Sequence, residues 1–268
     1  MLNDITMGQY YPVDSPIHRM DPRVKLLLTI LFIVMVFMAK TLVGYCLLFG
    51  LIYFVSRVAT IPFRMLLRGL KPLRIIVILT FLLNLFFTPG DHLLLSFWII
   101  RVSSEALRQA VFYSLRLIFL VLGTSLLTLT TSPVALSDAM EMLLSPLKKI
   151  HFPVHELAMM MTIALRFIPT LMEETDRIIK AQTARGADFA GGNLLARAKN
   201  MLPILVPLFI SAFRRADDLA VAMEARCYRG GEGRTRMHQL AYRSGDVAAF
   251  LFAFAMIGAL AFLRWALC

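Results

Sequence analysis

Five apolar runs, each close to the length that crosses a lipid bilayer, constrain this chain more than any other feature. A transmembrane helix needs about 20 apolar residues, with a usable range of roughly 17–25. The runs cover residues 24–39, 41–56, 73–89, 110–131 and 246–266. Hydrophobic residues make up 59% of the chain, whereas soluble domains are about half apolar. The sequence therefore predicts an all-α membrane protein with about five transmembrane helices.

The distribution of positive charge orients these helices. The formal net charge is +11, which in a soluble protein would suggest nucleic acid. In a membrane protein, Lys and Arg gather in cytoplasmic loops, and we favour that interpretation, with no nucleic-acid partner. Cations cluster before the first run, at 57–74 and at 148–243, but are scarce at 90–108. This predicts a cytoplasmic N-terminus and an external C-terminus, with Trp265 as an interfacial anchor.

Residues 132–245 are too long for a loop and yet stay apolar. Ser132-Pro133 is typical of a helix start, and Ser145-Pro146 of a stop. Two long periodic segments follow, at about 154–184 and 197–228. Each begins with apolar residues and ends with charged residues. We predict three cytoplasmic or interfacial helices here. The expected divisions are an N-terminal segment with a four-span bundle (1–131), this helical region (132–245) and a last transmembrane helix (246–268).

Two segments in the first third of the chain bear on how it meets the membrane. The first 20 residues are polar and have no apolar stretch typical of a signal peptide, so the first run is expected to remain as an anchor. The segment 61–74 places leucines among four cations. It is interpreted as an amphipathic piece on the inner leaflet or as an ordinary cytoplasmic loop.

A short motif occurs twice in the helical region, as AQTARG at 181–186 and AMEARC at 222–227. Each copy ends a predicted helix with an arginine and a small residue, and glycine-rich sequence follows. Glycine at that point is a common helix terminator. A single such arginine could merely complement the negative end of its helix dipole, at about 0.3–1 kcal/mol. Two matching copies suggest a partner with two equivalent pockets, as in a two-fold dimer.

These paired motifs, together with GQYYPVDSPIHRMDPRVKLL at 8–27, resemble the transmembrane T component of energy-coupling factor (ECF) transporters. The resemblance covers nearly the whole chain. The second copy departs slightly, with Cys227 where Gly186 stands in the first, and we expect only a small residue to be needed there. The residues that match the N-terminal motif of the family are His18, Arg19, Asp21, Pro22 and Lys25. We expect the first two to anchor the first span at the inner interface.

The resemblance implies an L-shaped, non-enzymatic scaffold in the cytoplasmic membrane of a bacterium or archaeon. Its partners would be two ATP-binding cassette subunits (A and A′) and a membrane-embedded S component that captures a vitamin or metal ion. The ATPase-docking residues would be Ala184, Arg185 and Gly186 in one copy, and Ala225, Arg226 and Cys227 in the other. ATP and Mg would be bound by the partners, with no cofactor on this chain. Consistently, the sequence has no G-x-x-x-x-G-K-[ST] phosphate loop.

Other candidate sites carry weaker signals. His151 and His155 have metal-ligand spacing, but Pro153 lies between them and no supporting cluster exists, so no metal site is predicted. The acidic side chains of Glu173, Glu174 and Asp176 are expected to form a solvated helix face with local salt bridges to Arg177 and Lys180. Arg116 is an intramembrane charge, hence a functional candidate, although snorkelling to the outer surface also explains it.

Two other functions remain open at this point. An intramembrane enzyme would need polar catalytic residues within the spans, where Asn84 and Arg116 are the main candidates. A self-sufficient permease would favour broken helices and buried charges at mid-membrane, and these are scarce. Methionines cluster at 140, 142, 159–161 and 172, either as surfaces for several partners or as gap-filling core residues.

Overall fold

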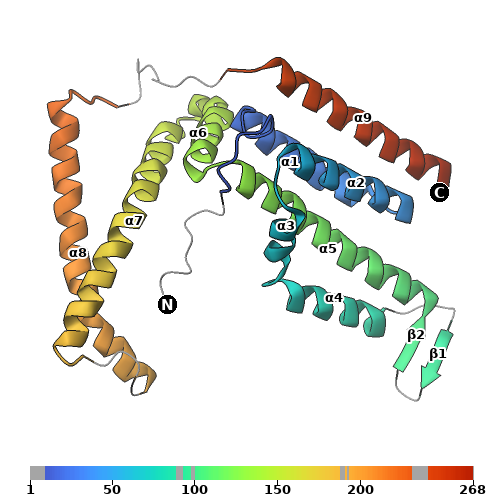
Figure 1. Cartoon of the computed structure of the whole chain (residues 1–268), viewed down its shortest axis with the longest axis horizontal. Helices are drawn as coiled ribbons and strands as arrows, with labels where there is room; N and C mark the ends of the chain where they lie inside the picture. Colours follow the sequence, from blue (N-terminus) through green and yellow to red (C-terminus); the bar gives the residue numbers. More distant parts are fainter. Residues whose placement is uncertain are drawn as a thin grey trace. The chain divides into compact units, whose positions relative to one another are not determined.

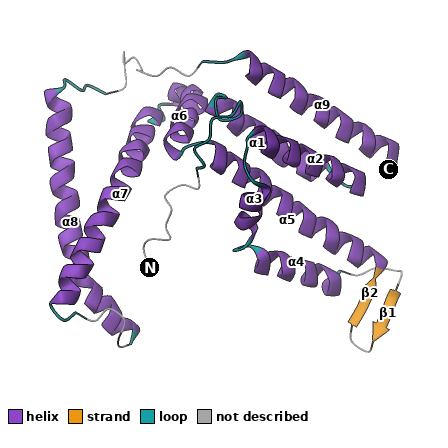
Figure 2. Cartoon of the chain, viewed as in Figure 1, coloured by secondary structure: helices purple, strands orange, loops and turns teal. Residues whose placement is uncertain are grey.

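The computed structural model describes residues 10–88, 93–97, 100–187, 191, 193–230 and 241–267. Within these residues the chain forms nine α-helices, one short 3₁₀ helix and one two-stranded hairpin (Figures 1 and 2). The prediction of an all-α fold is thus confirmed, with the hairpin as a small addition. Each of the five apolar runs lies largely within a helix.

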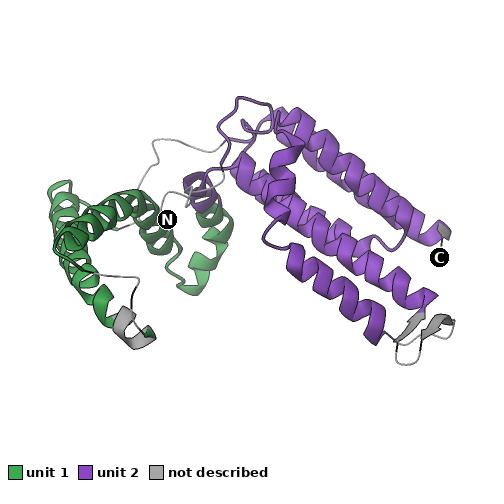
Figure 3. Ribbon diagram, turned by 60° about the horizontal axis from the view of Figure 1, so that its bottom comes forward, with its two compact units in different colours: residues 1–7, 140–238 green, residues 8–139, 239–268 purple. Residues whose placement is uncertain are grey.

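The chain divides into two compact units (Figure 3). The bundle unit contains residues 8–139 and 239–268, and the crossed-helix unit contains residues 1–7 and 140–238. The bundle unit holds α1 (Pro22–Met38), α2 (Leu42–Val58), α3 (Phe63–Leu70), α4 (Arg74–Phe87), β1 (Leu93–Phe97), β2 (Ile100–Ser103), α5 (Ser104–Thr130) and α9 (Ser244–Leu267). The crossed-helix unit holds the end of α6 (Pro133–Leu144) from Met140 onward, the 3₁₀ helix (Ser145–Ile150), α7 (Val154–Ala184) and α8 (Leu194–Ala225).

Polar side chains mark where several helices begin. The first backbone N–H groups of a helix have no partner within it, and a preceding hydroxyl or carboxylate can accept from them. Asp21 accepts from the Arg23 N–H at the start of α1, and Thr41 accepts from Gly44 at the start of α2. Ser103 does the same for α5, and Ser132 accepts from the Ala135 N–H at 3.3 Å. The last contact confirms the predicted start at Ser132-Pro133.

Helix α5 lies at the centre of the bundle unit and contacts α1, α2, α3 and α4, while α9 packs on α1. Small residues let these helices approach closely, as is common in membrane bundles. A Cβ added at Gly123 of α5 would lie 2.5 Å from the ring of Phe32 on α1. The core around this contact includes the buried side chains of Met35, Val36 and Leu122.

The external connection predicted at 90–108 contains an element that was not foreseen. Strands β1 and β2 pair antiparallel, with Leu93 opposite Ser103 and Phe97 opposite Ile100. Runs of apolar and β-branched residues suit a strand as well as a helix. This run is short, and so it forms a hairpin between α4 and α5.

Three described helices, α5, α7 and α9, are long and apolar enough to cross a membrane, judged by length and composition. Helices α3 and α4 are bent by 63° and would add a fourth span if they cross together. Helices α1 and α2 have 17 residues each, the lower end of the usable range. A multi-pass membrane protein follows from these lengths, and the count of five spans stays a prediction.

The N-terminal motif ties the start of α1 to α5 and α9. The buried Lys25 Nζ donates to the Thr130 carbonyl at 2.9 Å and to the His18 carbonyl at 3.1 Å. Asp246 of α9 is 1% exposed, and its carboxylate accepts from the N–H of Asp21 at 3.4 Å and from that of Arg243 at 2.8 Å. Such buried polar groups need partners, since an unsatisfied one costs about 1–3 kcal/mol.

Charge at this junction is balanced locally. Arg23 pairs with Asp21 at 2.7 Å, and its guanidinium lies 4.4 Å from the centre of the Tyr242 ring. Burial alone raises the pKa of Asp21, but the hydrogen bonds and charge of Arg23 outweigh it and hold that pKa below its usual value. His18 and Arg19 complete the motif: His18 Nδ1 lies 2.7 Å from Ser15 Oγ, and Arg19 pairs with Asp14.

We expect Lys25→Met to lower the free energy of unfolding by about 1–3 kcal/mol, because two carbonyls would lose a donor at a buried site. Thermal unfolding in detergent measures the change. Lys71→Met, at an exposed lysine after α3, is the control and should leave the midpoint nearly unchanged. Equal effects of the two substitutions would contradict a specific role for the buried ammonium.

Candidate functional site

Two long helices that cross carry both copies of the repeated motif. Helices α7 and α8 contact one another, and Figure 1 shows where they cross. At this crossing Arg215 of α8 pairs with Glu174 of α7 at 3.0 Å. The sequence predicted local salt bridges from this acidic cluster to Arg177 and Lys180. For Glu174 the contact is instead between helices, because the neighbouring helix brings a guanidinium to its face.

The crossing joins equivalent positions of the repeat. Glu174 and Arg215 are separated by 41 residues, and the same offset relates Arg185 to Arg226. Each motif arginine therefore follows its crossing residue by 11 positions, or about 16 Å of α-helix. The contact thus joins equivalent positions of the two copies, and one arginine lies at the end of each helix.

Both helices end with the same backbone geometry at these arginines. Arg185 follows the last residue of α7, and Arg226 follows the last residue of α8. After Arg185, the N–H of Gly186 donates to Thr183 O at 2.9 Å, and that of Ala187 donates to Gln182 O at 3.0 Å. This pair of bonds is the Schellman motif, which satisfies the free carbonyls at a helix end.

The second copy repeats this hydrogen-bond pattern. The N–H of Cys227 donates to Glu224 O at 2.8 Å, and that of Tyr228 donates to Met223 O at 3.0 Å. Gly186 has φ 87° and Cys227 has φ 59°, so both lie in the left-handed region. The sequence suggested that this position needs only a small residue. The structure shows a stricter requirement, a left-handed backbone, which glycine adopts freely and a residue with a Cβ adopts at a cost.

The side chains of Arg185 and Arg226 are exposed. Ala184 and Ala225, which precede them, are exposed as well and leave the surroundings of each guanidinium open. No intramolecular hydrogen bond or ion pair to either arginine side chain is found within the described parts of the chain. A planar guanidinium with five donors is suited to carbonyls and carboxylates in a groove of another protein.

The remaining length of α7 and α8 exposes many apolar side chains. Exposed examples are Met160, Met161 and Ile168 on α7, and Phe209 and Phe213 on α8, the last 67% exposed. Large exposed apolar surfaces mark contacts with other proteins or with lipid. The prolines inside these helices, Pro169, Pro203 and Pro207, all precede the crossing residues in the sequence. The segments between crossing and arginine are therefore uninterrupted helix.

The two histidines with metal-ligand spacing do not share a helix. His151 ends the 3₁₀ helix with φ 59°, whereas His155 lies in the first turn of α7 and its Nδ1 is 2.9 Å from Glu141 Oε1. The described residues hold no group of three or more His, Cys, Asp and Glu side chains placed to bind a metal ion. His155 is thus part of a side-chain hydrogen bond between α6 and α7.

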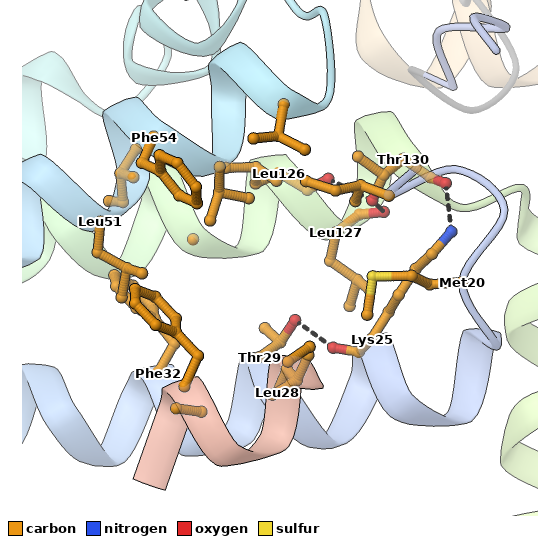
Figure 4. A pocket seen from close by; sticks show the side chains of 18 of the residues that line it. Met20, Lys25, Leu28, Thr29, Phe32, Leu51, Phe54, Leu126, Leu127 and Thr130 are labelled. Atoms are coloured by element: carbon orange, nitrogen blue, oxygen red, sulfur yellow. Dashed lines mark hydrogen bonds between the residues drawn. The ribbon is translucent and has the colours of Figure 1, made fainter. Parts of the chain in front are cut away.

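A cavity of about 310 Å³ lies between α1, α2, α5 and α9 (Figure 4). Its lining is mostly apolar, with Lys25, Thr29 and Thr130 as its polar residues. The Lys25 ammonium already binds two carbonyls, and Thr29 Oγ1 donates to Lys25 O at 2.8 Å. Few polar atoms are left to recognise a polar solute, so this cavity gives the permease hypothesis little support.

We expect reversal of one charge at the crossing to destabilise the helix pair and reversal of both to restore it. The pair is about one-third exposed, so its coupling energy should be about 1 kcal/mol or less. A double-mutant cycle of Glu174→Arg, Arg215→Glu and the combined swap, followed by thermal unfolding in detergent, measures it. A swap no more stable than the worse single variant would contradict this pairing.

We expect Cys227→Gly to stabilise the end of α8 and Gly186→Ala to destabilise the end of α7, each by about 1 kcal/mol. The reason is the positive φ at both positions. Gly245→Ala is the matched control, since Gly245 has no positive φ and no atom near its added Cβ. Thermal unfolding compares the three, and a Gly186→Ala protein as stable as Gly245→Ala would refute the explanation.

Comparison with known proteins identifies the family to which this chain belongs. The family model described as cobalt transport protein, CbiQ, matches residues 14–238. The energy-coupling factor transporter transmembrane protein EcfT of Acidaminococcus fermentans is 57% identical over 99% of this chain and 98% of its own length. That of Bacillus subtilis is 48% identical over 98% of this chain and 100% of its own length. This chain therefore belongs to the CbiQ family of transport proteins, as a transmembrane component of the energy-coupling factor type.

Proposed function

We propose that this chain is the energy-coupling scaffold of a micronutrient importer. It joins two cytoplasmic ATP-binding cassette subunits to a membrane-embedded S component that captures the cargo. The observation that carries the proposal is the pair of exposed arginines, Arg185 and Arg226, which end two crossed helices with the same backbone geometry. Family membership supports the transport role in general terms.

The repetition of the arginine motif and of its helix-end geometry suits a pair of related ATPase subunits. A two-fold dimer presents the same pocket twice, and the repeat presents the same guanidinium twice, equally far from the crossing. Each ATPase subunit would receive one arginine in a groove lined by carbonyls or carboxylates. ATP and Mg belong to these partners, and hydrolysis is their reaction.

Movement of the ATPases would reach the S component through α7 and α8. Their exposed apolar side chains, Phe209 and Phe213 among them, are suited to contact with a membrane-embedded partner. In the proposed topology the N-terminus is cytoplasmic and the crossed-helix unit is cytoplasmic or interfacial, as the positive-inside rule indicates. Cargo recognition resides in the S component, so one scaffold could serve different cargoes.

The central test is the double variant Arg185→Glu/Arg226→Glu. We expect it to lose both ATPase subunits on co-purification in mild detergent and to lose transport, because two docking charges would meet acidic or carbonyl-rich grooves with the wrong sign. The matched control is Arg177→Glu/Arg214→Glu, which changes the same net charge at exposed arginines of the same helices.

The outcomes separate the possible roles of the motif. Loss of ATPases in the motif variant and retention in the control support two-point docking. If both variants retain the ATPase subunits equally, the arginines only stabilise the helix ends and the docking surface lies elsewhere. Retention of ATPases with loss of coupling between hydrolysis and uptake would assign the arginines to transmission alone.

A further inference from the structure

A second hollow in the bundle unit, of about 450 Å³, carries an unusual concentration of positive charge. Its lining on α5 is a single helical stripe, Glu105, Arg108, Gln109, Phe112, Tyr113 and Arg116, and Ala39 and Lys40 complete it from the connection between α1 and α2. Three cations thus face one carboxylate. The volume lies within the range of small-molecule sites.

Contacts between α1 and α5 place this hollow at the end of the bundle away from the N-terminal motif. The helices are antiparallel, with Lys25 bonded to Thr130 at one end and Arg116 over the Phe37 ring at the other. Along α1, Lys25 and Ala39 are separated by about 21 Å. The α1–α2 connection cannot lie in lipid with bare backbone groups, so the hollow begins where the hydrocarbon ends.

Both arginines in the hollow lie against aromatic rings, and Arg116 also shares a side-chain hydrogen bond with Tyr45. The Arg116 guanidinium lies 5.2 Å from the centre of the Phe37 ring and 5.4 Å from that of Tyr113. Arg108 lies 5.5 Å from the centre of the Phe112 ring. Stacking on a ring face orients a guanidinium but uses none of its donors. The Nε of Arg116 is buried and has no hydrogen-bond partner among the described residues.

This end of the bundle is the one where cations are least expected. Loops on the non-cytoplasmic side are poor in Lys and Arg, and residues 90–107 of the connection contain only one of them, Arg101. Lys40, Arg108 and Arg116 depart from it and converge on one hollow. Snorkelling would explain one arginine but not three cations around a buried, unpaired donor. A bound anion at the membrane surface explains all of them.

We propose that this hollow binds the headgroup of an anionic glycerophospholipid. The chemistry of its lining fits phosphatidylglycerol. Lys40, Arg108 and Arg116 bind the phosphodiester, and the carboxylate of Glu105 accepts hydrogen bonds from the glycerol hydroxyls. Phe37, 54% exposed, lies beside the Arg116 guanidinium and offers its exposed surface to the acyl chains. Basic pockets between membrane helices bind anionic headgroups on the cytoplasmic side of membranes, and the same charge pairing would operate here.

The test is native mass spectrometry of the full chain released from nanodiscs with equal phosphatidylglycerol, phosphatidylethanolamine and phosphatidylcholine. We expect retained phosphatidylglycerol to exceed the other two. Lys40→Gln/Arg108→Gln should lower its retention roughly 25-fold, about fivefold for each cation removed. These two residues are exposed, so the fold should survive. The control is Arg64→Gln/Arg68→Gln, at exposed cations of α3.

Each outcome decides the proposal. Selective retention that is lost in the first variant and kept in the control supports it. No enrichment of phosphatidylglycerol, or equal loss in both variants, overturns it. A further arm adds inorganic phosphate to nanodiscs of phosphatidylcholine alone. If free phosphate binds with the same dependence on Lys40 and Arg108 and phosphatidylglycerol does not displace it, the hollow is a soluble-anion site and the lipid proposal fails.

Discussion

The crossing of α7 and α8 at Glu174 and Arg215 sets the position of everything that follows it in either helix. The ion pair itself contributes modestly to stability, because it is partly exposed. Its importance is that it fixes the register of α7 against α8, because it joins equivalent positions of a repeat with an offset of 41 residues. A slip of one helical turn at the crossing would leave one arginine farther out than the other, and a symmetric partner could not engage both.

The bundle unit obeys a different constraint, because a largely apolar core separates its two polar ends. At one end the side chains of Lys25, Asp21 and Asp246 are buried and hydrogen-bonded. Lys25 donates to two backbone carbonyls, and the carboxylate of Asp246 accepts from the N–H of Asp21. At the other end Arg116 lies against aromatic rings, and its Nε has no hydrogen-bond partner within the described part of the chain. The first end is closed and structural, and the second is open to a ligand.

Periodicity and helix-end signals predicted most of the fold. The expected segment 154–184 matches α7 at both ends, because Pro153 and Gly186 are unambiguous signals in the sequence. The two arginine motifs were also identifiable, since a repeat needs no structure to be seen. The hairpin at 93–103 was not foreseen, because a short apolar run fits a strand and a helix alike. Nor was the Glu174–Arg215 pair, because which face of α7 meets α8 depends on packing between segments that are far apart in sequence.

The prolines of α7 and α8 divide each helix into parts of unequal stiffness. Pro169 and Pro207 each remove a backbone hydrogen bond, and both lie within a few turns before the crossing. Between crossing and arginine the helix is unbroken. In the proposed function, a push on either arginine would therefore reach the Glu174–Arg215 contact through unbroken helix. Beyond that contact the proline sites can bend more easily than the rest of each helix, so they would set the direction in which the motion continues toward the membrane-embedded partner.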